Sequence, residues 1–355
     1  MSSRPRRLRR CQLSVPGSSE KMMTKAAGLE LDHVFLDLED AVAPDAKAAA
    51  RGLVVDALNN LDWKPKTLCY RINDVETKYC HDDIIEVVTG AGDKLDTIML
   101  TKAKSAHDIM FVHLMLDQLE KKLGLTKRIG IECLIEEVEG MMNVDEIAAS
   151  SDRLECLIFG MGDYSASQGM DLRGIGSASS YPPDLWHYPR YRMTIACRAN
   201  GIDPVDGPYA NFGNPEGYRT ECGRCKVLGM VGKWAIHPSQ VDIAQEVFSP
   251  TVEAVANARK QKAAYEDAMA RGIGAITVDG VMVDVASVRI LQNIIDQADL
   301  IGIKTPGANK RPKATKKKKV VRKKTAAKRN TTKKKTPAKK RPVAKKKAAK
   351  QRSRR

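Results

Sequence analysis

The sequence predicts an α/β protein built as a TIM-type (β/α)8 barrel. Short apolar runs of the kind that form buried parallel strands alternate with amphipathic helical segments through most of the chain. Eight such units fit into about 240 residues, which is the usual size of this barrel. A doubly wound open sheet is the alternative fold, but no glycine-rich fingerprint follows the first predicted strand. We therefore expect a closed barrel.

The predicted strands are short apolar runs at regular intervals. They cover residues 11–15, 33–38, 67–72, 97–101, 128–135, 156–161, 203–207 and 233–236. The helices predicted between them cover residues 20–27, 45–59, 80–89, 105–123, 138–150, 187–200 and 215–228. The clearest of these is 105–123, because apolar residues recur at three- to four-residue spacing behind Ser105, a favoured N-cap residue.

Two longer helical stretches, 251–271 and 284–298, follow the last predicted strand. The closing helix of a barrel requires only one of them. Between them, residues 271–275 and the pair Asp279-Gly280 supply a glycine-containing hinge. This pattern favours a barrel domain over residues 9–250. It also favours a helical lid over residues 251–303 that is exchanged with a neighbouring subunit.

The net charge of +17 combines two parts of opposite sign. Residues 304–355 hold 26 Lys and Arg and no Asp or Glu, so the preceding 303 residues carry about −9. The Lys- and Ala-rich tail has little to bury and is predicted to be disordered. It resembles the tails of linker histones and of some bacterial chromosome-associated proteins. We expect it to bind nucleic acid or another polyanion without sequence preference. A tail that only aids solubility is the alternative.

Other features limit the location and chemistry of the chain. No apolar run of 18 residues is present, so no membrane span is expected. Residues 1–8 form a basic segment, expected to be flexible, and lack the apolar core of a signal peptide. The cysteines lie mostly inside apolar runs, which indicates reduced thiols and a cytoplasmic protein. Cys222 and Cys225 form a lone CxxC pair, for which we expect neither zinc binding nor redox activity.

Three of the predicted strands end on carboxylates. Asp37, Glu39 and Asp40 close one, Glu136 closes another, and Asp163 follows a third. In a β/α barrel these strand ends meet at one face, where binding and chemistry are concentrated. Several acids gathered there repel one another unless a hard cation lies between them, and oxygen ligands suit Mg²⁺ or Mn²⁺. The sequence therefore predicts a metal-assisted active site.

Several strings, in order along residues 9–298, resemble the citrate lyase β-subunit and malyl-CoA lyase family, which belongs to the HpcH/HpaI-type aldolase superfamily of metal-dependent barrel lyases. The matching strings are Arg10–Gly17, Asp37–Val42, Arg71–Asn73, Leu134–Glu136, Phe159–Asp163, Trp234–Gln240 and Gly280–Asp284. The loop Gly162–Ser167 and the insertion Asp171–His187 resemble malyl-CoA lyases more than citrate lyase subunits. The tail after Lys304 lies outside the family pattern.

The resemblance implies roles for the acids and for one arginine. Glu136 and Asp163 would ligate Mg²⁺, Glu39 and Asp40 would hold water molecules around the ion, and Arg71 would bind glyoxylate. Simpler interpretations remain for each group. Acids favour the start of a solvated helix, Glu39 and Asp40 suit a helix cap, and an arginine often forms a surface salt bridge.

The resemblance also implies contacts with coenzyme A and a residue contributed by a second subunit. Arg10 and Lys25 would contact its phosphates, and Ile236, His237 and Pro238 would lie beside its adenine. Asp284 of a neighbouring lid would handle the proton of the acetyl-CoA methyl group. Its simpler interpretation is an N-cap of the 284–298 helix.

Together these residues imply a Mg²⁺-dependent carbon–carbon lyase. It would reversibly cleave L-malyl-CoA, and also β-methylmalyl-CoA, to acetyl-CoA or propionyl-CoA and glyoxylate, as a trimer or hexamer of identical subunits. Mn²⁺ would be an alternative metal. The alternatives within the family are a citryl-CoA-type lyase and a malyl-CoA thioesterase. An alternative of another class is a DNA-associated protein that acts through its basic tail.

Overall fold

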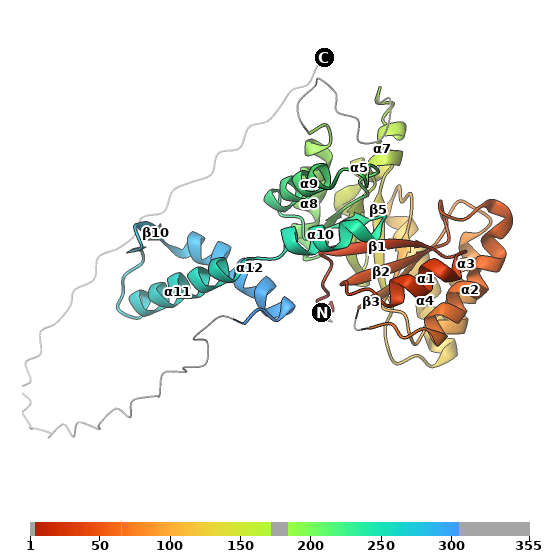
Figure 1. Cartoon of the computed structure of the whole chain (residues 1–355), viewed down its shortest axis with the longest axis horizontal. Coiled ribbons are helices and arrows are strands. Elements are labelled where there is room, and N and C mark those ends of the chain that lie inside the picture. Colours follow the sequence, from red (N-terminus) through yellow and green to blue (C-terminus); the bar gives the residue numbers. More distant parts are fainter. Residues whose placement is uncertain (1–3, 65, 172–183, 305–355) are drawn as a thin grey trace, which may run out of the picture. The chain divides into compact units, whose positions relative to one another are not determined.

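A computed structural model of the protein describes residues 4–64, 66–171 and 184–304 (Figure 1). Eight parallel strands close into a barrel in sequence order, β1 to β8. They are β1 Cys11–Pro16, β2 His33–Asp37, β3 Thr67–Arg71, β4 Thr97–Leu100, β5 Gly130–Ile135, β6 Leu154–Phe159, β7 Asp203–Asp206 and β8 Gly232–Ala235. The predicted barrel is confirmed, and the open sheet is excluded because β1 pairs with both β2 and β8.

Helices follow the strands and surround the barrel (Figure 1). They are α1 Glu20–Ala27, α2 Lys47–Asn60, α3 Cys80–Ala91, α4 Ala106–Leu123, α5 Val138–Met142, α6 Val144–Ala149, α7 Met161–Ser167, α8 His187–Asn200, α9 Pro215–Val227 and α10 Val241–Phe248. Two 3₁₀ turns, Pro44–Ala46 and Pro238–Gln240, add to them. The cap predicted at Ser105 is confirmed as a full capping box with Asp108.

Two helix predictions differ from the structure. The helix predicted over 138–150 is broken at Asn143 into α5 and α6. The closing helix of the barrel is α10, which was not predicted. Both longer helices beyond it therefore belong to the C-terminal extension.

The C-terminal extension is a pair of helices joined by a small hairpin. It contains α11 Val252–Met269, β9 Ile276–Val278, β10 Val281–Val283 and α12 Val285–Ile301, with α11 packed against α12. The segment predicted as a glycine hinge is in part an antiparallel hairpin. Its turn is Asp279-Gly280, and both residues have positive φ angles of 50° and 80°. Such a pair between short apolar runs is a strong hairpin signal.

Alternation along the strands divides the barrel interior into layers. Side chains two residues apart in a strand point the same way, so Glu132, Leu134 and Glu136 form one inward-facing column along β5. The middle layer is apolar and consists of Phe35, Cys69, Met99, Leu134, Cys156, Ile158, Val205 and Trp234. Polar layers lie at the two ends of the barrel. Glu136 belongs to the layer at the carboxyl ends of the strands, and Glu132 belongs to the opposite one.

The layer at the amino ends of the strands is a buried ionic network around Glu132. Its carboxylate is bonded by Arg9 at 3.1 Å, by His33 at 3.0 Å, by Gln12 at 2.7 Å and by Thr97 at 3.2 Å. Burial would raise the pKa of Glu132, but His33 and Arg9 hold it well below its ordinary value. The network closes this end of the barrel and leaves the other end for chemistry.

The termini show a further difference from prediction. Arg7 forms ion pairs with Asp96 and Glu155, both at 2.8 Å, and Arg4 donates to the carbonyl of Asn200 at 2.8 Å. Residues 4–8 therefore lie against the barrel, whereas a flexible segment was predicted for residues 1–8. The predicted disordered tail lies outside the described residues, apart from Lys304. In the described ranges, no helix has both the length and the apolar character that crossing a bilayer requires.

Candidate active site

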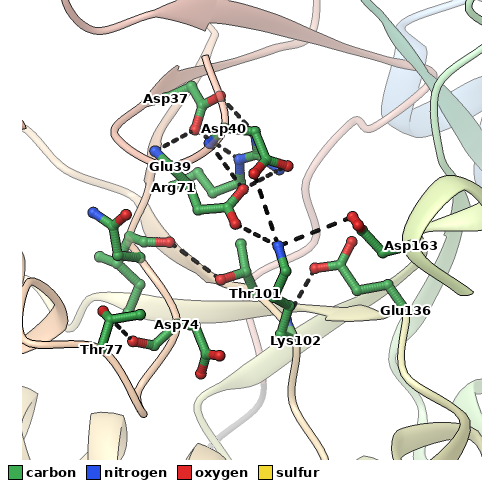
Figure 2. Close-up of polar contacts among 12 residues, drawn as sticks. Asp37, Glu39, Asp40, Arg71, Asp74, Thr77, Thr101, Lys102, Glu136 and Asp163 are labelled. Atoms are coloured by element: carbon green, nitrogen blue, oxygen red, sulfur yellow. Dashed lines mark hydrogen bonds and ion pairs between the residues drawn. The ribbon is translucent and has the colours of Figure 1, made fainter. Parts of the chain in front are cut away.

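The polar side chains of the candidate site come from the carboxyl ends of five successive strands, β2 to β6 (Figure 2). Each one is the last residue of its strand or follows it within four residues. They are Asp37, Glu39, Asp40, Arg71, Lys102, Glu136 and Asp163. The structure thus brings together all five barrel acids and cations that the sequence predicted for the reaction centre. Two members of the cluster, Asp37 and Lys102, were not predicted as site residues.

Arg71 and Asp37 form a buried, bidentate ion pair. Nε of Arg71 lies 2.7 Å from Oδ1 of Asp37, and Nη2 lies 2.5 Å from Oδ2. Asp37 also accepts from the N–H groups of Glu39 and Ala41. Burial alone would raise the pKa of Asp37, but Arg71 holds it below its ordinary value. Arg71 is therefore a fixed, buried cation, and the alternative of a surface salt bridge is excluded.

The remaining nitrogen of Arg71 faces the acid cluster. Nη1 lies 3.2 Å from Oε2 of Glu39 and 4.0 Å from Oδ2 of Asp40. The rings of Phe35 and Trp234 lie beside the guanidinium, with their centroids 5.9 and 5.5 Å from its central carbon. These rings add cation–π attraction and fix the plane of the guanidinium. One edge of Arg71 is thus anchored and the other is directed into the site.

Glu136 is the buried carboxylate of the cluster. It follows β5 directly and is 2% exposed. Its Oε1 accepts from the backbone N–H of Lys102 at 2.9 Å. Burial raises the pKa of Glu136 to about 8, although Lys102 and Arg71 both oppose the shift. The negative charge of a carboxylate in this position is therefore only partly compensated.

Gly160 makes the space that Glu136 occupies. A β-carbon added to Gly160 would lie 2.5 Å from the Cβ of Glu136, and closer still to its Oε2. Gly160 follows β6 directly and is the N-cap of α7, with φ at −85°. A glycine is thus required here by close approach to Glu136 rather than by backbone conformation.

Asp163 lies in the first turn of α7, the short helix that follows β6. Its side chain is 46% exposed, in contrast to that of Glu136. Figure 2 shows the carboxylates of Asp163 and Glu136 on the same side of the cluster, both next to Lys102. A carboxylate in the first turn is also favoured by the helix dipole. The pair combines one buried and one solvent-facing carboxylate.

Lys102 lies at the centre of the acids. Its ammonium forms an ion pair with Glu39 and lies 3.9 Å from both Asp40 and Asp163. Burial would lower the pKa of Lys102, but Glu136, Glu39 and Asp40 together raise it above its ordinary value. Lys102 was not predicted as a site residue because no acidic residue stands next to it after the short strand β4.

Glu39 bridges the two cations of the site. Oε2 faces Arg71 and Oε1 faces Lys102. Burial raises the pKa of Glu39, and Arg71 and Lys102 oppose the shift. The loop that carries Glu39 is held by Lys47, whose ammonium donates to the carbonyls of Leu38 and Glu39 at 2.9 and 2.7 Å. Glu39 is therefore held by ionic contacts rather than acting only as a helix cap.

Glu136 and Asp163 fit a small, hard cation. Both offer carboxylate oxygens, and Mg²⁺ is usually held by one or two carboxylates while it keeps several water ligands. A cation would compensate the buried charge of Glu136, and the exposure of Asp163 leaves room for water. Among the described residues, no group of three or more His, Cys, Asp and Glu is arranged to hold a metal. Both proposed donors are carboxylates, and a set of oxygen donors suits Mg²⁺ better than Zn²⁺, which prefers His and Cys ligands.

The structure does not bring Arg10 to this site. Arg10 precedes β1 and thus lies at the amino ends of the strands, opposite the acid cluster. Its guanidinium is paired with Asp32 at 2.6 and 2.7 Å and donates to Ser249 at 2.8 Å. This position corrects the prediction that Arg10 contacts coenzyme A at the active site. The reason is strand direction, because a residue that precedes a strand lies at the end of the barrel opposite to the carboxyl ends.

The other predicted coenzyme A residues lie at or near the carboxyl ends of the strands. Ile236, His237 and Pro238 follow β8 directly. Ile236 is 39% exposed, and the ring of His237 stacks on Phe212 with their centroids 4.9 Å apart. Lys25 is exposed in the last turn of α1, the helix after β1. The described contacts include none that joins these residues to the acid cluster.

Asp284 lies in the C-terminal extension and caps α12. Its carboxylate accepts from the N–H and the hydroxyl of Ser287 at 2.8 and 2.9 Å. These hydrogen bonds lower the pKa of Asp284. The N-cap interpretation is thus correct for this single chain. A role in the site of a neighbouring subunit is compatible with the cap and stays a prediction.

The barrel, with acids and a buried arginine at the carboxyl ends of its strands, is that of a TIM-barrel enzyme. Residues 10–238 match the model of the HpcH/HpaI aldolase/citrate lyase family. The chain belongs to this family, and the resemblance predicted from the sequence is confirmed at that level.

Relatives in this family include well-defined enzymes. The chain is 43% identical over 307 residues to the L-malyl-CoA/beta-methylmalyl-CoA lyase of Cereibacter sphaeroides (strain ATCC 17025 / ATH 2.4.3), covering 84% of this chain and 96% of that one. It is 34% identical over 292 residues to the (3S)-malyl-CoA thioesterase of the same strain, covering 82% and 95%. CitE from Mycobacterium tuberculosis, solved in complex with magnesium, acetoacetate and coenzyme A, aligns with a TM-score of 0.65 and 26% identity, covering 81% and 97%.

Proposed function

We propose that the protein is a Mg²⁺-dependent carbon–carbon lyase that reversibly cleaves L-malyl-CoA to acetyl-CoA and glyoxylate. The observation that carries the proposal is the cluster at the carboxyl ends of the strands, where Glu136 and Asp163 lie next to Lys102 and Glu39 links Lys102 to the buried Arg71. The 43% identity to an L-malyl-CoA/beta-methylmalyl-CoA lyase supports the same reaction. β-Methylmalyl-CoA, which would yield propionyl-CoA, is proposed as a second substrate because a binding site discriminates only weakly against one added methyl group.

Glu136 and Asp163 would hold the metal, with Glu39 and Asp40 orienting its water ligands. When bound, Mg²⁺, or Mn²⁺ with similar oxygen ligands, supplies a Lewis acid that polarises the oxygens of the substrate. The free edge of Arg71 would bind the substrate carboxylate through a charge-assisted hydrogen bond. Because Asp37 fixes the other edge, Arg71 requires no reorganisation when the substrate arrives.

In the cleavage direction a base removes the proton of the malyl hydroxyl group. The carbon–carbon bond then breaks, which leaves glyoxylate and the enolate of the acetyl thioester. Asp284 of a neighbouring subunit would protonate the enolate carbon to give acetyl-CoA. One proton leaves the hydroxyl and one joins the carbon, so the reaction as a whole consumes no proton. Arg71 would offset the negative charge as it builds.

Coenzyme A would extend from this site across the carboxyl ends of the strands. The exposed Ile236 and the stacked His237, followed by Pro238, offer a flat surface for the adenine. Lys25 offers a cation for a phosphate group. The use of Asp284 from a neighbour requires a homo-oligomer, which we propose to be a trimer or hexamer. We also propose a cytoplasmic location.

Two other activities compete with this proposal. A malyl-CoA thioesterase would release coenzyme A and malate without forming glyoxylate, and the 34% identity to such an enzyme favours testing it. A citryl-CoA-type lyase would accept a larger acyl group. A function of another class, contact with nucleic acid or another polyanion through residues 304–355, is proposed from the charge of the tail alone.

The decisive experiment supplies the purified protein with malyl-CoA, β-methylmalyl-CoA and citryl-CoA, with Mg²⁺ and with a chelator. Free thiol and glyoxylate are assayed separately, and acyl-CoA products are identified by mass spectrometry. We expect glyoxylate and acetyl-CoA from malyl-CoA only when the metal is present. Release of free thiol without glyoxylate would overturn the lyase proposal in favour of the thioesterase.

A second experiment separates the tail from the barrel. A chain truncated before Lys304 is expected to keep its lyase activity and lose binding to a DNA duplex at low salt. A truncated chain that still binds the duplex would contradict the proposed role of the tail.

A further inference from the structure

Lys102 is the cation that contacts acids from three different parts of the barrel. It pairs with Glu39 from the loop after β2, and its ammonium lies 3.9 Å from Asp163 in α7. Its backbone N–H bonds to Glu136 after β5. Figure 2 shows its side chain rising between these acids. The position of Lys102 is thus set by the site itself, not by an accidental surface contact.

The backbone of Lys102 has a conformation that lysine rarely adopts. Its φ angle is 50°, and Lys102 and Asp279 are the two residues other than glycine with positive φ in the described chain. This left-handed turn directs the N–H toward Glu136 while the side chain reaches Glu39. Uncommon backbone conformations of this kind are concentrated at functional sites. The positive φ angle is therefore consistent with a functional position at the end of β4.

The ammonium of Lys102 retains unused donors. Of its three N–H groups, one is satisfied by Glu39. The distances of 3.9 Å to Asp40 and Asp163 are ion pairs, but they are too long for hydrogen bonds. Within the described residues, no other acceptor lies in hydrogen-bond range of this nitrogen. The side chain is 22% exposed, so a ligand at the strand ends can reach it.

Glu39 holds Lys102 and Arg71 as a pair. Its two oxygens face the two cations, which are therefore separated by about the width of one carboxylate. Nη1 of Arg71 and the ammonium of Lys102 each carry more N–H groups than the one that Glu39 can accept. A second small carboxylate fits this arrangement because it can accept from both cations at once.

The charges of the cluster favour the same ligand. Five carboxylates, those of Asp37, Glu39, Asp40, Glu136 and Asp163, face Arg71 and Lys102. With all of them ionised, a divalent cation still leaves an excess of one negative charge. Without Lys102 the excess would be two, and an incoming carboxylate would be repelled more strongly.

We infer that Lys102 binds the carboxylate of the two-carbon oxo acid together with Arg71. The inference rests on the proposed function, because it deepens the assignment of glyoxylate to this site. Arg71 supplies the donor anchored by Asp37, and Lys102 supplies a second donor and the positive charge that admits the anion. Metal binding, in contrast, does not require Lys102, because its charge repels a cation.

The test uses the full-length protein with the substitution K102M, which keeps an unbranched side chain of nearly the same length and removes its charge. Glyoxylate binding to the Mg²⁺-loaded protein is measured by titration calorimetry, and Mg²⁺ binding to the substrate-free protein is measured in the same way. We expect glyoxylate to bind about tenfold more weakly or worse, since hydrogen bonds to charged groups are lost. Mg²⁺ binding should be unchanged or tighter.

K104M serves as the matched control, because Lys104 is two residues away and pairs with the exposed Glu76 at 2.8 Å. It should bind both ligands like the wild type. K102R should recover part of the glyoxylate affinity. K102G relieves the positive φ angle, so it provides a second variant if K102M does not fold.

Two results would overturn the inference. Unchanged glyoxylate affinity in K102M and K102G would show that Lys102 stays with the acids throughout. Loss of Mg²⁺ binding in both variants would show that it only arranges the ligands. The proposed function fails separately, if the wild type binds glyoxylate but does not cleave malyl-CoA.

Discussion

Asp37 and Arg71 are direct cross-strand partners at the ends of β2 and β3. Their side chains form a bidentate ion pair with nitrogen–oxygen distances of 2.7 and 2.5 Å. Asp37 is fully buried and Arg71 is 6% exposed. The pairing leaves one nitrogen of Arg71 for the site and directs it toward Glu39. The register of two strands thus determines where the cation of the active site lies.

Replacing Asp37 by asparagine should therefore damage both stability and activity. D37N leaves a buried guanidinium without its compensating charge, which costs about 3–5 kcal/mol of folding free energy. Urea denaturation measures this loss. D152N is the control, because Asp152 pairs with Arg128 at the surface, and exposed pairs contribute at most about 1 kcal/mol. A loss in D37N as small as that of the control would contradict the role given to Asp37.

Replacing either proposed metal ligand should strongly weaken metal binding and leave the fold intact. E136Q and D163N are expected to weaken Mg²⁺ binding by more than about a hundredfold, since even groups that only support a ligand contribute 10–100-fold. The raised pKa of Glu136 shows that its charge is unfavourable in the metal-free fold, so E136Q should be no less stable than the wild type. Calorimetric titration and thermal melting check the two expectations.

E139Q is the matched control for these ligands, because Glu139 is an exposed acid on α5, three residues from Glu136. It should bind Mg²⁺ like the wild type. If E136Q or D163N kept near-wild-type affinity, Mg²⁺ would have to be held elsewhere.

Adding a single methyl group at position 160 should also weaken Mg²⁺ binding. In G160A the new carbon would lie 2.5 Å from the Cβ of Glu136 and would displace that side chain. We expect Mg²⁺ affinity to fall at least about tenfold, since ligand geometry is tightly required by this ion. G52A is the control, because a β-carbon at Gly52 in α2 meets nothing within 4 Å. It should be neutral or stabilise by roughly 0.5–1 kcal/mol. Wild-type metal binding by G160A would argue against the close approach.

The buried network at the other end of the barrel predicts a pH dependence of stability. The pKa of Glu132 is held below its ordinary value of 4.5. Its contribution to stability is therefore fully present above about pH 4.5 and is lost as the pH falls toward the lowered pKa. E132Q should cost about 3–5 kcal/mol at pH 7, because Arg9 and His33 lose their charged partner. Between about pH 5 and 3 its stability should fall less steeply than that of the wild type.

Denaturation at a series of pH values measures both effects. If the free energy of unfolding of E132Q fell with pH as steeply as that of the wild type, other carboxylates would be the cause of the acid sensitivity.

Local patterns were enough to predict the barrel and the acids. Buried parallel strands are continuous apolar runs, and in a β/α barrel their ends define one face. Glu136, Asp163 and Arg71 could be predicted because each adjoins such a run. Arg10 adjoins a run as well, but at its start. Strand direction alone would have excluded it from the site.

Lys102 and Asp37 could not be predicted in the same way. Lys102 becomes central only when β4 is placed between β3 and β5 and its backbone turns left-handed. Asp37 lies in the same acidic string as Glu39 and Asp40, and only its register opposite Arg71 separates its role from theirs. The hairpin at Asp279-Gly280, in contrast, had a recognisable signal in its two flanking apolar runs.

Exchange of the lid between subunits can be tested by mixing two inactive variants. D284N keeps the cap of α12, because asparagine is a good N-cap residue, but it removes the acid proposed to act in the neighbouring site. E136Q lacks the proposed metal ligand of its own site and would still offer Asp284 to a neighbour. In oligomers assembled at random from equal amounts of both, about one quarter of the sites would have Glu136 from one subunit and Asp284 from the next. Co-expression with two affinity tags isolates the mixed oligomers and removes those made of a single variant, so their lyase activity should reach at least that fraction of the wild type. Mixed oligomers as inactive as either parent would place the action of Asp284 within its own chain, because no mixed site could then be complete.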